Sequence, residues 1–444
     1  MRLRRTGFGL GIAAGLAACG ILACGTLAFA ILAWRPALAP GGPAEAALSP
    51  ERIRAGAHLA ALGACASCHT APGGLPYAGG RPIATPYGTL YGTNITPDPE
   101  TGLGRWSLAA FARALREGVD REGRHLYPAF PYTHYAGLTD ADVAALYAFV
   151  MSREPVHQVS PPNALPAWLS WRPVLAGWKL LFFRPRPFAP DPGRDAAWNR
   201  GAYLAEALGH CGACHSPRNA LSAEVTARAY AGGEADGWWA PPLDGASPAP
   251  LPWSEDDLVR YLSDWDPRHG GAAGPMRPVV EAHRAVPADE IRALARYVAG
   301  LYGPEPRGAR RGPVDREPAG DGPALARGRA IYAGACATCH ESGGGAAGGV
   351  PYTTASLGHR TTLAAPDPRN LILVLRDGIA PREHAPGPIM PAFGAVLTAD
   401  QTSDLAAYLR ARFSAEGPWP DLPGTVRTLM PAAPAPGARA EARP

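Results

Sequence analysis

Three copies of the pattern Cys-x-x-Cys-His carry the clearest chemistry in this chain of 444 residues. The three motifs are Cys65-Ala-Ser-Cys68-His69, Cys211-Gly-Ala-Cys214-His215 and Cys336-Ala-Thr-Cys339-His340. In this pattern the two thiols bond to the vinyl groups of a haem, and the adjacent histidine binds the iron from one side. Because the pattern is complete each time, the sequence predicts three covalently bound haems of the c type.

Two other uses of paired cysteines fit this chain less well. A structural zinc site needs four ligands, usually from two pairs, so three motifs would leave one pair without a partner. A thiol–disulfide motif is expected in a βαβ setting, which the surrounding pattern does not indicate. The other two of the eight cysteines, Cys19 and Cys24, lie in the apolar N-terminus, so no cysteine remains for a structural disulfide.

A haem iron that transfers electrons normally has a second axial ligand, which is commonly methionine or histidine. Two of the five methionines, Met276 and Met390, lie in loops rich in Gly and Pro ahead of a terminal helix. We expect Met276 to bind the second iron opposite His215, and Met390 to bind the third iron opposite His340.

The first motif has no such methionine. Phe130 stands at the place that corresponds to Met390, and phenylalanine cannot bind iron. His134, a little further along the chain, is the expected ligand opposite His69. His125 is one alternative, and an open or water-bound iron is another. Because thioether ligation raises haem potential relative to imidazole, the first haem is expected to have the lowest potential of the three.

Similar helices must position each motif. A short Ala-rich helix precedes every motif, and it contains a glycine that would let another helix cross closely. These glycines are Gly56, Gly201 and Gly328. An amphipathic helix closes each repeat. The spacing that caps the start of such a helix occurs twice, at Thr139 with Asp142 and at Thr398 with Gln401.

The composition limits the remaining choices. A net charge of +4 is small for this length and gives no support for nucleic-acid binding, which needs a clustered basic face, so that function is set aside. The chain divides into an N-terminal signal-anchor or transmembrane segment (1–40), a first haem domain (49–155), a Trp- and Pro-rich linker (156–195), a second haem domain (196–302), a second linker (303–322), a third haem domain (323–415) and a disordered tail (416–444). The first linker either packs across its neighbours or docks on a membrane or partner.

The N-terminus has the charge pattern of an exported protein. Arg2, Arg4 and Arg5 precede an uncharged run from Thr6 to Trp34. This run is long enough to cross a bilayer, and the preceding charges place the rest of the chain outside the cytoplasm. Cleavage near 36–39, or lipidation at Cys19, are alternatives that also export the chain. We expect haem domains that face the periplasm from the cytoplasmic membrane.

The chain resembles the three-haem cytochrome c subunits of membrane-bound bacterial dehydrogenases. The resemblance rests on the three haem motifs and on the phrases at 93–98 (TNITPD), 126–132 (LYPAFPY) and 272–276 (AAGPM). It implies an all-α fold of three tandem cytochrome c-like domains with an N-terminal transmembrane anchor. It also implies an electron-transfer subunit without substrate chemistry of its own.

Phe130 separates this chain from part of that family. The branches that serve quinoprotein alcohol dehydrogenases and flavin-dependent gluconate, sorbitol and fructose dehydrogenases normally carry methionine there. The form with Phe130 and His134 resembles the cytochrome partners of molybdenum hydroxylases, which act on nicotinate, isoquinoline or aldehydes. This implies a catalytic partner with molybdopterin and iron–sulfur clusters, and quinone or a terminal oxidase as acceptor.

Alternative functions remain at this point. The chain could serve one of the quinoprotein or flavin-dependent enzymes. It could also be a peroxidase-like haem enzyme that uses an open first haem. A haem subunit of a terminal oxidase fits least well.

Overall fold

The computed structural model describes residues 48–303, 312–320, 322–341, 356–380 and 389–430, together with Gly25, Phe29, Ala30 and residues 33–43. The chain forms two compact units. Unit one comprises residues 1–60 and 68–189, and unit two comprises residues 61–67 and 190–444. The predicted division into three haem domains with two linkers stays a prediction.

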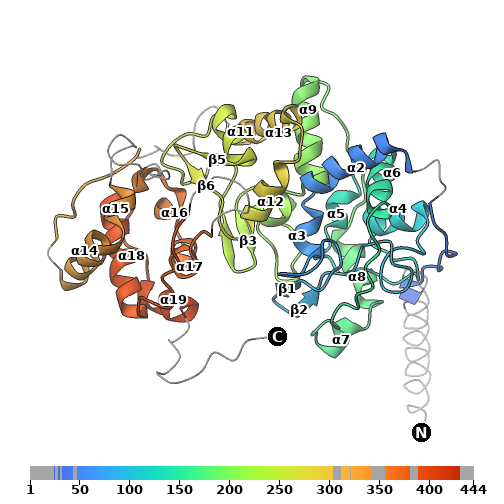
Figure 1. Cartoon of the computed structure of the whole chain (residues 1–444), viewed down its shortest axis with the longest axis horizontal. Coiled ribbons are helices and arrows are strands. Elements are labelled where there is room, and N and C mark those ends of the chain that lie inside the picture. The colour runs from blue at the N-terminus through green and yellow to red at the C-terminus, as the bar shows by residue number, and fades with distance from the viewer. Residues whose placement is uncertain are drawn as a thin grey trace, which may run out of the picture. The chain divides into compact units, whose positions relative to one another are not determined.

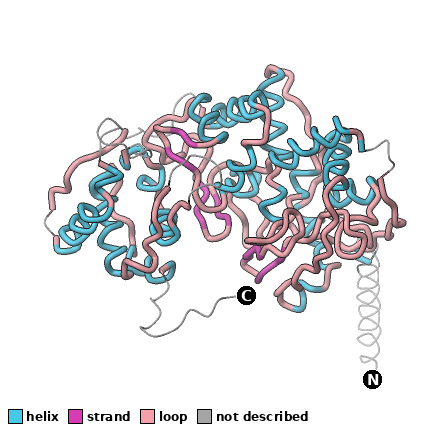
Figure 2. The backbone as a smooth tube through the Cα atoms, in the orientation of Figure 1, coloured by secondary structure: helices cyan, strands magenta, loops and turns pink. Residues whose placement is uncertain are grey.

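Most of the described chain is helix and long loop (Figures 1 and 2). The helices up to residue 189 are α2 (Pro50–Leu62), α3 (Cys65–His69), α4 (Leu108–Glu117), α5 (Tyr132–Tyr135), α6 (Asp140–Met151), α7 (Ala167–Ser170) and α8 (Val174–Phe182). The later helices are α9 (Ala196–Tyr203), α10 (Gly212–His215), α11 (Glu255–Ser263), α12 (Met276–His283), α13 (Ala288–Leu301), α14 (Pro323–Ala335), α15 (Ala337–His340), α16 (Thr361–Ala364), α17 (Arg369–Asp377), α18 (Ala399–Phe413) and α19 (Leu422–Leu429). Short irregular turns of helix are η2 (Leu204–Leu208), η3 (Thr226–Arg228) and η5 (Leu357–His359).

The predicted helix starts are confirmed. The Thr139 side chain accepts a hydrogen bond from the backbone N–H of Asp142, and α6 begins at the next residue, Asp140. Thr398 and Gln401 form a reciprocal capping box at the start of α18. These caps satisfy N–H groups that have no partner within the helix, which fixes where each closing helix begins.

The predicted crossing glycines are also confirmed. A methyl group built on Gly56 would lie 1.9 Å from the carbonyl oxygen of Ala145 on α6. A methyl group built on Gly201 would lie 1.9 Å from the carbonyl oxygen of Ala293 on α13. One built on Gly328 would lie 2.2 Å from the carbonyl oxygen of Asp404 on α18. The helix before each haem motif therefore touches the closing helix backbone to backbone, where only glycine fits.

Replacing Gly328 by alanine should destabilise unit two by about 1–3 kcal/mol, because the added methyl group meets backbone that cannot move aside. The matched control is Gly334→Ala on the same helix, where nothing lies within 4 Å of the added carbon. The control should be neutral or stabilising by about 0.5–1 kcal/mol, because alanine favours the helix. Urea unfolding of both variants measures the difference. Equal stabilities would show that the crossing is not as close as the structure has it.

The all-α prediction is wrong. Among the described residues, three antiparallel two-stranded sheets are present, drawn as short hairpins in Figure 2. They pair β1 (Pro82–Thr85) with β2 (Gly88–Tyr91), β3 (Gly233–Ala235) with β4 (Trp238–Ala240), and β5 (Trp265–Asp266) with β6 (Gly270–Gly271). The physical reason is local, since tight turns in these loops bring short segments into register. Asp236 and Gly237, for example, both have positive φ, as a two-residue hairpin turn requires.

The transmembrane part of the fold-class prediction is corrected as well. No helix in the described part of the chain combines the length and the apolar character needed to cross a membrane. Residues 1–24, which make up most of the segment predicted as an anchor, lie outside the described residues.

Part of the predicted disordered tail has a defined structure. Helix α19 packs on α17 and α18, and buries Leu422, Val426 and the following Met430. The spacing of these apolar residues matches one face of a helix. Sequence reasoning missed this helix because the tail around it is rich in proline and alanine. Residues 431–444 lie outside the described residues.

Candidate haem sites

Each Cys-x-x-Cys-His motif forms a short helical turn. The turns are α3, α10 and α15. In the third turn, the backbone N–H groups of Cys339 and His340 both bond to the carbonyl of Cys336, at 3.1 Å. Residues three apart lie on one side of a helix, so this conformation presents both thiols together with the histidine just beyond them.

Two of the three motif histidines are oriented as iron ligands. Nδ1 of His69 lies 2.7 Å from the carbonyl oxygen of Thr93, and Nδ1 of His215 lies 2.7 Å from that of Pro241. A carbonyl only accepts, so Nδ1 carries the proton and donates it. The lone pair is then on Nε2, which is the atom that binds a metal. Burial lowers the pKa of both imidazoles and favours this neutral form.

The third histidine is described less completely. Nδ1 of His340 is buried and has no hydrogen-bond partner among the described residues. Burial, and then the nearby Arg360 guanidinium, lower the pKa of His340, so it too is held in the neutral form that can bind iron.

The chain after each of the first two motifs returns to cover it. A methyl group built on Gly92 would lie 1.9 Å from the carbonyl oxygen of Cys68, and one built on Gly233 would lie 2.4 Å from that of Cys214. Glycine allows these close approaches because it has no Cβ. The geometry of the motifs and of their histidines therefore fits c-type haem, which would be held by two thioether bonds and by Nε2.

The structure places the two candidate methionines in comparable settings. Met276 is half-buried and is the first residue of α12. Met390 is also half-buried and packs against the hydrophobic core around α18. Its backbone exchanges hydrogen bonds of 2.8 and 2.9 Å with Ile379, just after α17. Both side chains remain predicted sixth ligands.

The candidates in the first haem domain differ in how they are held. His134 is half-buried on the single turn of α5, and Phe130 packs its ring against Tyr135 at 5.4 Å. His125 is buried and engaged at both ring nitrogens. Its Nε2 lies 3.0 Å from the carbonyl oxygen of Ala33, and its Nδ1 lies 3.1 Å from Nζ of Lys179. This arrangement disfavours His125 as a ligand, and His134 stays the predicted one.

Sequence reasoning missed the role of Lys179. Its buried ammonium donates hydrogen bonds of 2.6 Å to the carbonyls of Glu117 and Gly118, which end α4, and it also faces His125. Carbonyls at a helix C-terminus attract a cation. Burial nevertheless lowers the pKa of Lys179 to about 7. Lys179 lies in the predicted linker, so α8 of that linker is fastened to the first haem domain.

Replacing His125 by glutamine should make unit one less sensitive to acid. Burial, and then the Lys179 charge, lower the pKa of His125 from 6.5 to about 4. Between these two values the unfolded chain binds more protons than the folded chain, so the folded wild-type protein loses stability as the pH falls. The loss should reach about 2–3 kcal/mol at about pH 4.5. Urea unfolding of both proteins at neutral and acid pH measures it, and an identical pH dependence would contradict the assignment.

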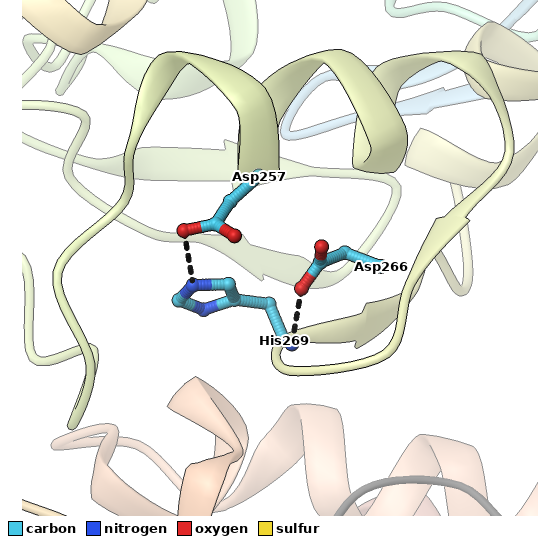
Figure 3. A group of neighbouring side chains, drawn as sticks. All are labelled: Asp257, Asp266 and His269. Carbon is cyan, nitrogen blue, oxygen red and sulfur yellow. Dashed lines mark hydrogen bonds and ion pairs between the residues drawn. The ribbon is translucent and has the colours of Figure 1, made fainter.

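A buried acidic cluster was not expected from the sequence. The side chains of Asp257, Asp266 and His269 approach one another closely enough to hold a metal ion, within 4.8 Å (Figure 3). Arg260 pairs with both aspartates at 2.5 and 2.7 Å, and Arg268 pairs with Asp257 at 3.0 Å. Two guanidinium groups therefore balance two carboxylates, and the cluster is a compensated structural network. Asp257 also forms a capping box with Ser254 at the start of α11, and this Ser-x-x-Asp spacing is the signal of the cluster that the sequence offers.

Two parts of the chain match known families. Residues 53–154 match the cytochrome c family, and residues 323–409 match the family described as cytochrome c oxidase, cbb3-type, subunit III.

Relatives match most of the chain. It is 46% identical over 392 residues to a nicotinate dehydrogenase subunit from Pseudomonas putida, and the match covers 87% of this chain but 32% of that protein. It is 38% identical to the gluconate 2-dehydrogenase cytochrome c subunit of Pantoea cypripedii, covering 81% of this chain and 85% of the relative. It is 35% identical to the cytochrome c subunit of the quinone alcohol dehydrogenase of Gluconacetobacter polyoxogenes, covering 82% and 81%. The chain thus spans about a third of the first relative and most of the other two.

Proposed function

The chain belongs to the family of cytochrome c subunits of dehydrogenase complexes, and on that premise we propose that it carries three covalent haems and passes electrons from a partner dehydrogenase to quinone or a terminal oxidase. Bound haem supplies one-electron chemistry at its iron. The chain's own residues attach it, orient the histidine ligands and exclude water. The charge pattern of the N-terminus favours export, so we propose that the haem domains face the periplasm.

One observation carries the proposal. Nδ1 of His69 and Nδ1 of His215 are each fixed by a backbone carbonyl at 2.7 Å, in two motifs that lie far apart in the sequence. A histidine that served only packing would have no need of the same tautomer, next to the same pair of cysteines, in both places. The arrangement leaves Nε2 available at both sites, as iron ligation requires.

The finer part of the proposal concerns the partner. We propose a molybdenum hydroxylase, whose catalytic subunits hold molybdopterin and iron–sulfur clusters. The similarity to a nicotinate dehydrogenase subunit along most of this chain supports that choice. Phe130, where the quinoprotein and flavin-dependent branches normally have methionine, supports it too. The substrate belongs to the partner.

Two measurements test the proposal. The mass of the mature protein under denaturing conditions should exceed that of the polypeptide by three haems. A mass without added haem would refute the proposed function. The protein should then be purified with its partner from its native cells, and the complex analysed for molybdenum, quinone cofactor and flavin. Molybdenum supports the proposed partner, whereas a quinone cofactor or flavin without molybdenum favours the other branches.

A further inference from the structure

The loop that follows the second haem motif forms a hairpin that contacts both the motif histidine and the loop that carries Met276. We define the coupling hairpin as residues 232–241, which include β3 and β4. The N–H of Gly232 bonds to the carbonyl of His215 at 2.8 Å, and the Pro241 carbonyl accepts the hydrogen bond from Nδ1 of His215. Both ends of the hairpin are thus fastened to the histidine that is expected to bind the second iron.

The turn side of the hairpin contacts the loop of the candidate methionine. A methyl group built on Gly274 would lie 2.4 Å from the indole ring of Trp238, and Gly274 has a φ of +55°. Met276 is two residues further along the chain. The ring of Trp238 therefore lies directly on the backbone that carries Met276, and glycine is required there both by the contact and by the conformation.

The outer face of the hairpin is bound by the third haem domain. The Asn370 side chain on α17 accepts a hydrogen bond from the backbone N–H of Trp239 at 2.9 Å and donates one to its carbonyl at 2.7 Å. Next to it, Arg369 pairs with Glu234 at 2.5 Å. An amide that bonds both backbone groups of one residue fixes its position, in the way that a neighbouring strand does.

Helix α17 continues this chain of contacts toward the third site. Its buried residues Leu371, Ile372 and Leu375 belong to the core against which Met390 packs. Just beyond the helix, Ile379 forms the two backbone hydrogen bonds with Met390. The hairpin and α17 are thus joined in one contiguous path of hydrogen bonds and packed side chains between two ligand loops.

We propose that the coupling hairpin positions Met276 as the ligand of the second haem, and that Asn370 of the third haem domain holds the hairpin in place for this. Trp238 and Asn370 are positioning residues, because they act through the Met276 loop and not on the iron. The inference rests on the proposed function, since it concerns the haems that the motifs would attach. It predicts that a change in the third domain alters ligation in the second.

The test measures how firmly each methionine holds its iron in the oxidised, full-length holoprotein. Free imidazole binds such an iron only when the methionine has left, so its apparent affinity reports that opening equilibrium. Trp238→Ala should raise the affinity of one haem about tenfold, and Asn370→Ala should raise that of the same haem by about threefold or more. The haems should bind imidazole in separate phases of the titration. The phase that Met276→Leu alters belongs to the second haem. Trp238→Phe should restore near wild-type behaviour, because a ring again covers Gly274.

Asn199→Ala is the matched control. The Asn199 side chain also bonds several backbone groups, those of Asp191, Arg194 and Asp195, but it lies outside the hairpin. It should leave all imidazole affinities unchanged. If Asn370→Ala alters only the third haem or none, while the mass still shows three haems, the coupling is refuted and the proposed function stands. A mass that lacks the second haem in the unaltered protein would instead refute the proposed function.

Discussion

Replacing Cys211 and Cys214 by alanine is expected to give a protein with two haems instead of three. In the proposed function two thioether bonds would be the only covalent links to the second haem, and without them the axial ligands alone would hold it. Burial raises the pKa of the Cys211 thiol to about 12, so the unattached thiol would be protonated and a poor nucleophile at neutral pH. The mass of the purified variant under denaturing conditions should be lower by one haem, beyond the small change from the substitutions.

The N-terminal cysteines provide the matched control. Cys19→Ala with Cys24→Ala changes the same number of thiols outside the motifs, and this variant should keep all three haems if both cysteines are present in the mature chain. If the Cys211/Cys214 variant still carried three haems after denaturation, the motif would not be an attachment site. If the N-terminal variant lost a haem, the experiment would be measuring a general defect in maturation and not the loss of an attachment site.

The sequence predicted the elements whose signals are local. The caps at Thr139 and Thr398 lie within three residues of their partners, so the starts of α6 and α18 can be found without tertiary information. The crossing glycines were found because the same short helix recurs before each haem motif. Its third copy, with Gly328, packs on α18 as the first copy, with Gly56, packs on α6.

The strands were missed because each sheet is only two short segments long, too short for an alternating pattern to stand out. A turn signal was nevertheless present. Asp236-Gly237 is a typical two-residue hairpin turn, and it sits between Ala235 and Trp238, the last and first residues of β3 and β4. Attention to that dipeptide would have predicted the coupling hairpin from the sequence.

The residues of the candidate haem sites also differ in how far the sequence could predict them. The cysteines and histidines of the motifs are contiguous, so the sequence predicts them without tertiary information. The groups that orient the histidines, the carbonyls of Thr93 and Pro241, are backbone atoms that any residue can supply, and sequence cannot reveal them. Lys179 reaches His125 from the predicted linker, a contact that depends on how α8 packs. The sixth ligands stay predictions for this reason, since a loop side chain is placed by tertiary packing.

Replacing His134 by alanine is expected to convert the first haem from low-spin to high-spin. If His134 binds the iron opposite His69, its removal leaves a position that only water or nothing fills, because Phe130 has no ligand atom. The oxidised protein should then show a high-spin fraction of about one third, since one haem of three is affected. The first midpoint potential, expected to be the lowest of the three in the wild-type protein, should change while the other two keep their values.

His125→Ala is the comparison that makes this result specific. Both ring nitrogens of His125 are engaged, by Ala33 and by Lys179, so its loss should weaken unit one without producing high-spin haem. A high-spin signal from the His125 variant alone would exchange the two assignments. A high-spin fraction already present in the wild-type protein would mean that the first iron is open. His134 would then be a polar neighbour of an open site, and a peroxidase-like activity would become the function to test.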